Sequence, residues 1–119
     1  MATFTKKKLS GSTDGLAIKV TGTGTGSTVT VHTAVSGTTT GVFDEIWLYA
    51  NNTSTSAVKL TLEWGTATAA DGNIELTIAA EAGLVLVVPG LILQNSKVVK
   101  AFAGTADVIL LSGFVNAIA

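Results

Sequence analysis

Hydrophobic and polar residues alternate with a period of two along most of the chain. The alternation is clearest at residues 16–20, 28–32, 59–64 and 74–78, where every second residue is apolar. Successive side chains of an extended chain point to opposite faces, so this pattern predicts β-strands with one face toward a core. Threonine fills many of the other positions, and its branched side chain suits the exposed face of a pleated sheet.

Two segments are apolar on both faces. Residues 43–51 contain the run Ile46-Trp47-Leu48-Tyr49, and residues 108–115 contain Ile109-Leu110-Leu111. Their length and their flanking glycine and asparagine favour strands over buried helices. We expect each segment to be a central strand, or a strand buried at a contact between subunits.

Turn signals separate these segments at short intervals. Residues 70–73, Ala-Asp-Gly-Asn, are typical of a hairpin turn, and Pro89-Gly90 fits the middle of a type II turn. Many short strands at this spacing predict an all-β fold, a single-domain antiparallel β-sandwich or jelly roll over residues 13–119. Residues 1–12 are polar and lysine-rich, and we expect an arm outside this domain. The predicted strands number about eight and lie near residues 15–21, 27–34, 43–51, 57–64, 73–79, 83–88, 96–103 and 107–117.

The composition suggests that the chain does not act alone. It is 47% hydrophobic and 13% charged, has 19 threonines and contains no arginine, whereas an ordinary domain is about 25% charged. A monomer with so few charged residues would leave much apolar surface exposed to water. That surface is most simply buried against other copies of the chain or in a larger assembly. A net charge of −1 gives no general attraction to nucleic acid or to anionic lipid.

Two classes of segment are not expected. The most apolar run, residues 83–93, is about half as long as a membrane helix and contains Pro89-Gly90, so we expect no membrane span. The basic residues near the N-terminus are not followed by an apolar segment, so we expect no secretory signal. The protein is then expected to stay in a cytoplasm until it is assembled.

Residues that carry chemistry are few. His32 is the single histidine, and it has two interpretations: a general base oriented by Asp44 or Glu45 beside a hydroxyl nucleophile, or a polar residue on the outer face of a threonine-rich strand. No nucleophile motif accompanies it, which favours the second interpretation and a protein that is not an enzyme. With one histidine, no cysteine and only a fragment of a calcium loop at residues 71–73, we expect no metal and no cofactor.

Lysines and tryptophans are the candidate binding residues. Lys6, Lys7 and Lys8 form either a solvated arm or an arm that docks on an acidic protein surface, and they are a poor signal for nucleic acid because no aromatic residue stands among them. Trp47 and Trp64 lie in apolar strand patterns, which favours a core or interface position over stacking on sugars in a lectin-like groove. The glycine-rich run at residues 21–26 lacks the lysine of a phosphate-binding loop, so we expect a turn or a loosely ordered strand.

Five segments from Phe43 onward have a recognisable sequence. They are DEIWLYANNT at 44–53, VKLTLEWG at 58–65, VVPGL at 87–91, AFA at 101–103 and GFVN at 113–116. Through these segments the chain resembles small virion proteins of tailed bacteriophages, several of which decorate or cement the head. The resemblance implies a β-sandwich or jelly-roll subunit, commonly trimeric, on the outside of the capsid where capsomers meet, with the major capsid protein as partner and no catalytic residues.

The expected function is thus a capsid decoration subunit on the virion surface; the alternative is a carbohydrate-binding module of a fibre or tail component. The candidate interface residues are Lys6, Lys7, Lys8, Trp47, Tyr49 and Phe114.

Overall fold

The computed structural model, which describes residues 2–119, is an antiparallel β-sandwich. The all-β prediction is confirmed: the described residues form nine strands and no α-helix, and a single 3-10 turn spans Thr25–Ser27. The strands are β1 (Phe4–Lys8), β2 (Ile18–Lys19), β3 (Val29–Thr33), β4 (Phe43–Asn52), β5 (Val58–Trp64), β6 (Asn73–Ile78), β7 (Val85–Leu93), β8 (Val98–Ala103) and β9 (Ile109–Ile118).

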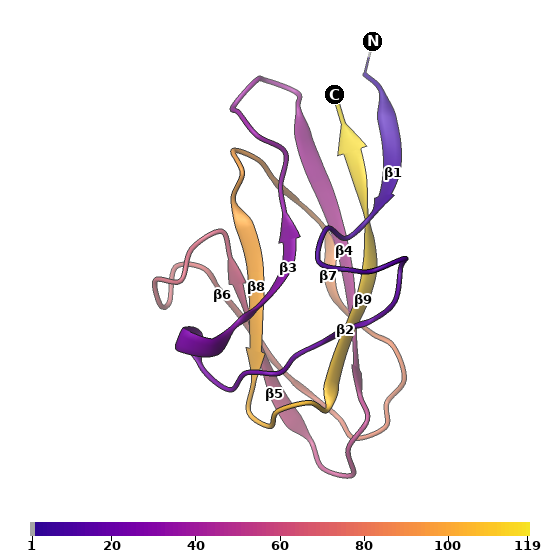
Figure 1. Ribbon diagram of the computed structural model, residues 1–119, viewed down its shortest axis with the longest axis vertical. Coiled ribbons are helices and arrows are strands. Elements are labelled where there is room, and N and C mark those ends of the chain that lie inside the picture. The colour runs from indigo at the N-terminus through magenta and orange to yellow at the C-terminus, as the bar shows by residue number, and fades with distance from the viewer. Residues whose placement is uncertain (1) are drawn as a thin grey trace.

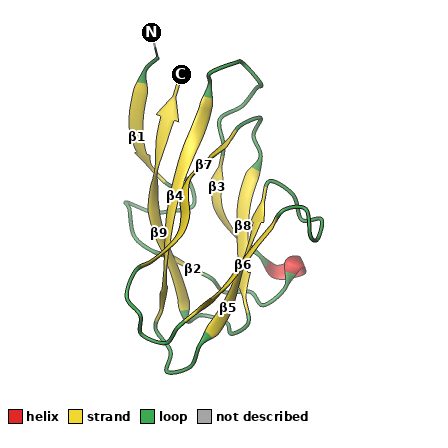
Figure 2. Cartoon of the chain, turned by 180° about the vertical axis from the view of Figure 1, so that it is seen from behind, coloured by secondary structure: helices red, strands yellow, loops and turns green. Residues whose placement is uncertain are grey.

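Two sheets pack face to face (Figures 1 and 2). Sheet A has the order β1-β9-β4-β7, with β2 also paired to β9, and sheet B has the order β3-β8-β5-β6. The two segments that are apolar on both faces became β4 and β9, and both have a strand on either side. The two chain ends lie together at one end of the sandwich (Figure 1), where Thr3 and Ala119 exchange backbone hydrogen bonds of 2.6 and 2.9 Å.

The core between the sheets consists of aliphatic side chains. In β4, buried and half-buried residues alternate without interruption, and Ile46, Leu48 and Ala50 have no exposed surface. Leu60 and Leu62 of β5 are equally buried in the opposite sheet. Each buried valine, leucine or isoleucine side chain contributes roughly 1.5–3 kcal/mol, so the stability of the core is the sum of many modest contributions.

The N-terminal segment differs from the expected arm. Met1 lies outside the described residues, but Phe4–Lys8 form an edge strand of sheet A, paired with β9 in the register Phe4↔Ile118 to Lys8↔Phe114. Directly after this strand, Leu9 is buried in the core with 1% of its surface exposed. The sequence pattern did not predict this strand because all five residues of β1 are exposed. A strand with no buried face shows no alternation of apolar and polar residues.

The expected type II turn at Pro89-Gly90 is also wrong. Both residues lie inside β7, which continues to Leu93 at the free edge of sheet A. An edge strand tolerates proline because the missing N–H can face solvent. Gly90 is skipped in the pairing with β4 and has a φ of 80°, so it forms a bulge that glycine adopts without strain. By contrast, the turn expected at residues 70–73 does lie in the connection between the paired strands β5 and β6.

Candidate functional site

The outer face of sheet A, turned away from sheet B, carries an aromatic pair. Trp47 of β4 is the direct neighbour of Phe114 of β9, and their rings are stacked with centroids 6.1 Å apart and planes 11° from parallel. Lys6 of β1 places its Nζ 4.3 Å from the centroid of the Phe114 ring, within cation–π range. Three of the candidate interface residues are therefore in contact.

A carboxylate fixes the indole ring of Trp47. Glu45 lies two residues earlier on the same face, and its Oε1 accepts hydrogen bonds from Trp47 Nε1 at 2.7 Å and from Asn116 Nδ2 at 3.0 Å. These two bonds, that of Trp47 foremost, hold the pKa of the Glu45 carboxyl below its usual range, because donors stabilise the charged form. On the far side of Trp47, Gly90 leaves room for the ring.

The remaining aromatic candidates separate. Tyr49 is half-buried and pairs with Ser112 on one side and Leu86 on the other, so it extends the same outer face toward β7. Trp64 is half-buried against the hydrophobic core instead. Tyr49 thus shares the outer face with Trp47 and Phe114, and Trp64 does not.

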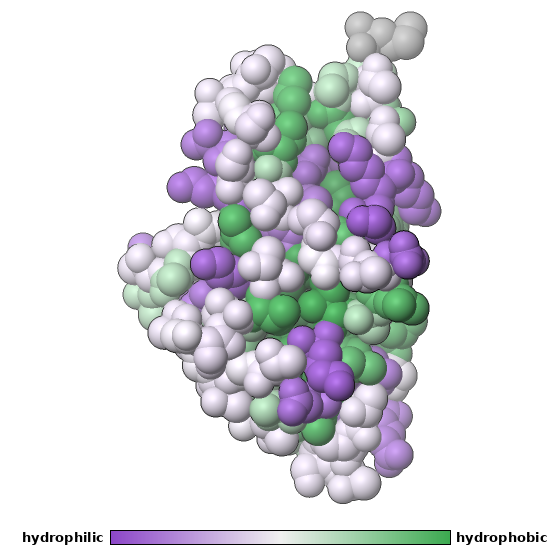
Figure 3. Space-filling view, in the orientation of Figure 1, coloured by the Kyte–Doolittle hydropathy of each residue, from purple (hydrophilic) through white to green (hydrophobic). Residues whose placement is uncertain are grey.

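The three lysines do not act as one group. Lys6 and Lys8 are the neighbours of Asn116 and Phe114 and share the outer face, whereas Lys7 is the neighbour of the buried Val115. All three are exposed along the edge. Figure 3 shows hydrophilic side chains gathered over β1, while much of the remaining visible face has intermediate hydropathy.

His32 is buried, which corrects its expected position on the outer face of a strand. A bulge in β3 between Thr30 and His32 turns both Val31 and His32 inward, and His32 keeps 4% of its surface exposed. Its Nε2 lies 2.7 Å from Asp44 Oδ2, and its Nδ1 accepts the Ser10 N–H at 3.0 Å. Because a backbone N–H can only donate, the proton of the neutral ring lies on Nε2 and is donated to Asp44.

This arrangement joins His32 to one of the two acids expected for a general base, but it leaves no free ring nitrogen. The hydroxyl of Ser10, whose N–H binds the ring, accepts the Thr33 N–H at 2.7 Å. Asp44 also accepts the Val35 N–H at 3.2 Å. The cluster therefore ties β3, β4 and the segment after β1 together.

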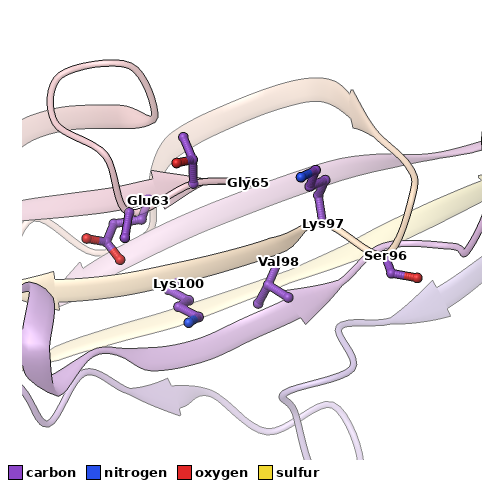
Figure 4. A pocket seen from close by; sticks show the side chains of 8 residues that line it. Glu63, Gly65, Ser96, Lys97, Val98 and Lys100 are labelled. Atoms are coloured by element: carbon purple, nitrogen blue, oxygen red, sulfur yellow. The ribbon is translucent and has the colours of Figure 1, made fainter.

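A second buried acid was not singled out by the sequence. Glu63 of β5 is 2% exposed because the glycine-rich loop folds over it, and the Thr25 hydroxyl donates to its Oε2 at 2.5 Å. Its other oxygen, Oε1, is buried without a hydrogen-bond partner. Glu63 lines a hollow of about 220 Å³ together with Lys97 and Lys100 (Figure 4). The strand pattern puts Glu63 on a polar face, and no local signal shows that a distant loop covers it.

Exposed apolar side chains gather at β7. Of the six large hydrophobic residues exposed in the described chain, four belong to this strand or directly precede it. We call these four residues the β7 strip. They are Leu84, Leu86, Leu91 and Ile92, with 65%, 46%, 44% and 54% of their surface exposed.

Across residues 2–119, no three histidine, cysteine or acidic side chains lie together in a way that could hold a metal ion. Over the same residues, no helix has the length and apolar character needed to cross a membrane.

Comparison with known proteins gives no relative for this chain. Family models, curated proteins and solved structures all return no match.

Proposed function

We propose that this protein is a structural virion protein of a tailed bacteriophage, a capsid decoration (cement) subunit that binds the outside of the head as a trimer. One observation carries the proposal: the two edges of sheet A differ in chemistry. The β1 edge carries three lysines, and the β7 edge carries exposed leucine and isoleucine without charge. A decoration subunit needs two such surfaces, one for the shell and one for its own copies.

The lysine edge suits an acidic surface of the major capsid protein. Lys7 and Lys8 line a hollow of about 520 Å³ beside the exposed strand β1, and Lys6 is held over Phe114. Contacts of this kind are weak singly and are screened by salt. Many copies on one shell supply avidity, and about 800 Å² per partner is enough for a stable contact.

Catalysis has no part in this proposal. Both ring nitrogens of His32 are occupied by Ser10 and Asp44, so the histidine would have to break a bond before it could accept a proton. Binding energy spread over a surface is sufficient for a cement protein, which requires neither a cofactor nor a metal.

Immunogold labelling of intact particles tests the proposal. Antibodies against the purified chain are applied to phage particles from cells that carry the gene, and gold over the outside of the head is the expected result. Gold confined to the tail, or particles that remain unlabelled, would refute the decoration role. Purified heads should also bind the wild-type protein more tightly than a Lys6→Thr/Lys7→Thr/Lys8→Thr variant, with a difference that shrinks as salt rises.

A carbohydrate-binding module of a fibre or tail component is the second candidate. It is favoured by the position of Trp47 beside a carboxylate and an amide, Glu45 and Asn116, on the outer face of the sheet. Against it, Phe114 already stacks on Trp47. Tryptophan fluorescence in a Trp64→Phe background, titrated with a panel of soluble glycans, tests this candidate. A saturable shift of the spectrum supports carbohydrate binding, and a spectrum unchanged by every glycan excludes it.

A further inference from the structure

The β7 strip ends at a hollow with a partly apolar wall. This hollow, of about 380 Å³, is lined by the apolar residues Phe43, Ile92 and Leu93, by the uncharged polar residues Thr38, Gln94 and Asn95, and by Lys97. Leu84, with 65% of its surface exposed, stands just before the opposite end of the same strand. The chain therefore carries an apolar projection at one end of β7 and a recess with an apolar wall at the other end.

We propose that copies of this chain bind one another head to tail along β7, with Leu84 of one copy seated in the hollow beside Ile92 of the next. The head-to-tail contact is independent of the capsid; only the number of copies, three, rests on the proposed function. A contact between two different patches closes into a ring when its rotation allows.

The scarcity of charge in this region favours a second copy as the occupant. The sequence from Gly83 to Ser96 contains no charged residue. Lys97 lines the hollow, but in a head-to-tail contact it would face the uncharged Leu84 of the next copy, so two copies can meet here without placing like charges together. The other exposed edges are chemically different. Three lysines line β1, and Glu75 of the edge strand β6 is paired with Lys59.

The backbone of β7 is unsuited to adding another strand. Pro89 has no N–H to donate, and the register with β4 skips Val87 and Gly90. An open edge that could recruit copies without limit is therefore interrupted in its middle. Association through side chains, with a projection in a recess, remains available and gives a defined contact.

Light scattering coupled to size exclusion, over a range of protein concentrations, tests the contact. The wild-type protein should form a closed oligomer, and Leu84→Lys and Ile92→Lys should each raise its dissociation constant at least tenfold, because either change places an uncompensated charge in an apolar contact. Leu16→Lys is the matched control: Leu16 is 67% exposed but belongs to a loop outside β7, so its oligomer should be unchanged.

Three results would overturn the inference. They are a wild-type protein that stays monomeric at about 100 μM, an oligomer whose dissociation constant is unchanged by Leu84→Lys and Ile92→Lys, and a dissociation constant that rises as much with Leu16→Lys as with those two substitutions. Circular dichroism of each variant verifies that the fold is intact. The outcome is separable from the capsid role. An oligomer that depends on the β7 strip but never labels heads refutes only the proposed function. Heads that label equally well with a monomer refute this contact and the trimer, and leave the decoration role in place.

Discussion

The two edges of sheet A, β1 and β7, are protected against pairing with other chains in different ways. Any edge strand leaves backbone groups unpaired and invites other chains. The β1 edge is protected by the charges of its three lysines and is fixed from behind, where Leu9 is buried and Ser10 binds His32. The β7 edge has no charge and is interrupted by Pro89 and two bulges. The lysines of β1 repel the same lysines of another copy of the chain. The interrupted hydrogen-bonding pattern of β7 blocks the addition of a strand but leaves the side chains free to pack.

Loss of the histidine should affect the β1 side most. His32→Leu removes the donor to Asp44 and leaves that carboxylate, 6% exposed, with the Val35 N–H alone. Removing one member of a buried polar pair costs about 3–5 kcal/mol of unfolding free energy, measurable by urea denaturation. The double variant His32→Leu/Asp44→Leu should recover part of this loss. A single variant within about 1 kcal/mol of wild type would show that the cluster does not fix this side.

Leu9 tests how firmly the core holds the lysine edge. Leu9→Ala should lower the unfolding free energy by about 2–5 kcal/mol, because it deletes buried methyl groups and leaves a cavity. Leu16→Ala is the matched control and should change stability by less than about 0.5 kcal/mol, since Leu16 is exposed. Equal effects of the two substitutions in urea denaturation would contradict the burial of Leu9.

Gly90 tests the β7 side. Gly90→Ala should cost about 1–3 kcal/mol, because its φ of 80° disfavours a side chain and the new Cβ would lie 2.9 Å from Trp47 Cζ2. Gly37→Ala provides the comparison, since Gly37 has a φ of 85° but nothing within 4 Å of a new Cβ. The excess cost at Gly90 measures its contact with Trp47. If both variants unfold at the same urea concentration, the ring does not constrain β7.

The smallest effect should appear at acid pH on the face between the two edges. Since the pKa of Glu45 is lowered by bonds from Trp47 and Asn116, its stabilisation is complete above the ordinary pKa of glutamate, about 4.3. It is lost as pH falls through the lower value in the folded protein. In a Trp64→Phe background, Trp47 fluorescence should therefore titrate below about pH 4.3.

Glu45→Gln should abolish this titration, and Glu75→Gln should leave it in place. Glu75 also has a lowered pKa, owing to Lys59, but it lies in the other sheet and has no bond to Trp47. A titration that survives Glu45→Gln would assign the fluorescence change to another group.

The sequence anticipated elements whose reasons are local and missed positions that depend on distant segments. The alternation in β5 and β6 predicted both strands, and the Ala-Asp-Gly-Asn sequence at residues 70–73 predicted the turn between them. Other positions could not be found in this way. His32 turns inward because a bulge shifts its register against β8, and Glu63 is buried because Thr25 covers it from a loop 38 residues away.

The candidate surface was predicted in part. Trp47, Phe114 and Lys6 were named separately, and the structure joins them through pairing of β1, β4 and β9. The exposure of the β7 strip could not be predicted, because an apolar run is equally compatible with a buried strand. Whether leucine is buried depends on the presence of a neighbour, and β7 has one on only one side.

By itself, the sequence determined an all-β chain, its central strands β4 and β9, and its poverty of charge. A period of two and an apolar run require only the geometry of an extended backbone and the exclusion of water from apolar side chains. The tertiary structure alone decided that the lysine segment pairs with β9, that proline continues a strand, and that one edge is charged and the other is not. Those outcomes depend on which strands become neighbours, as for Phe4 and Ile118 at opposite ends of the chain.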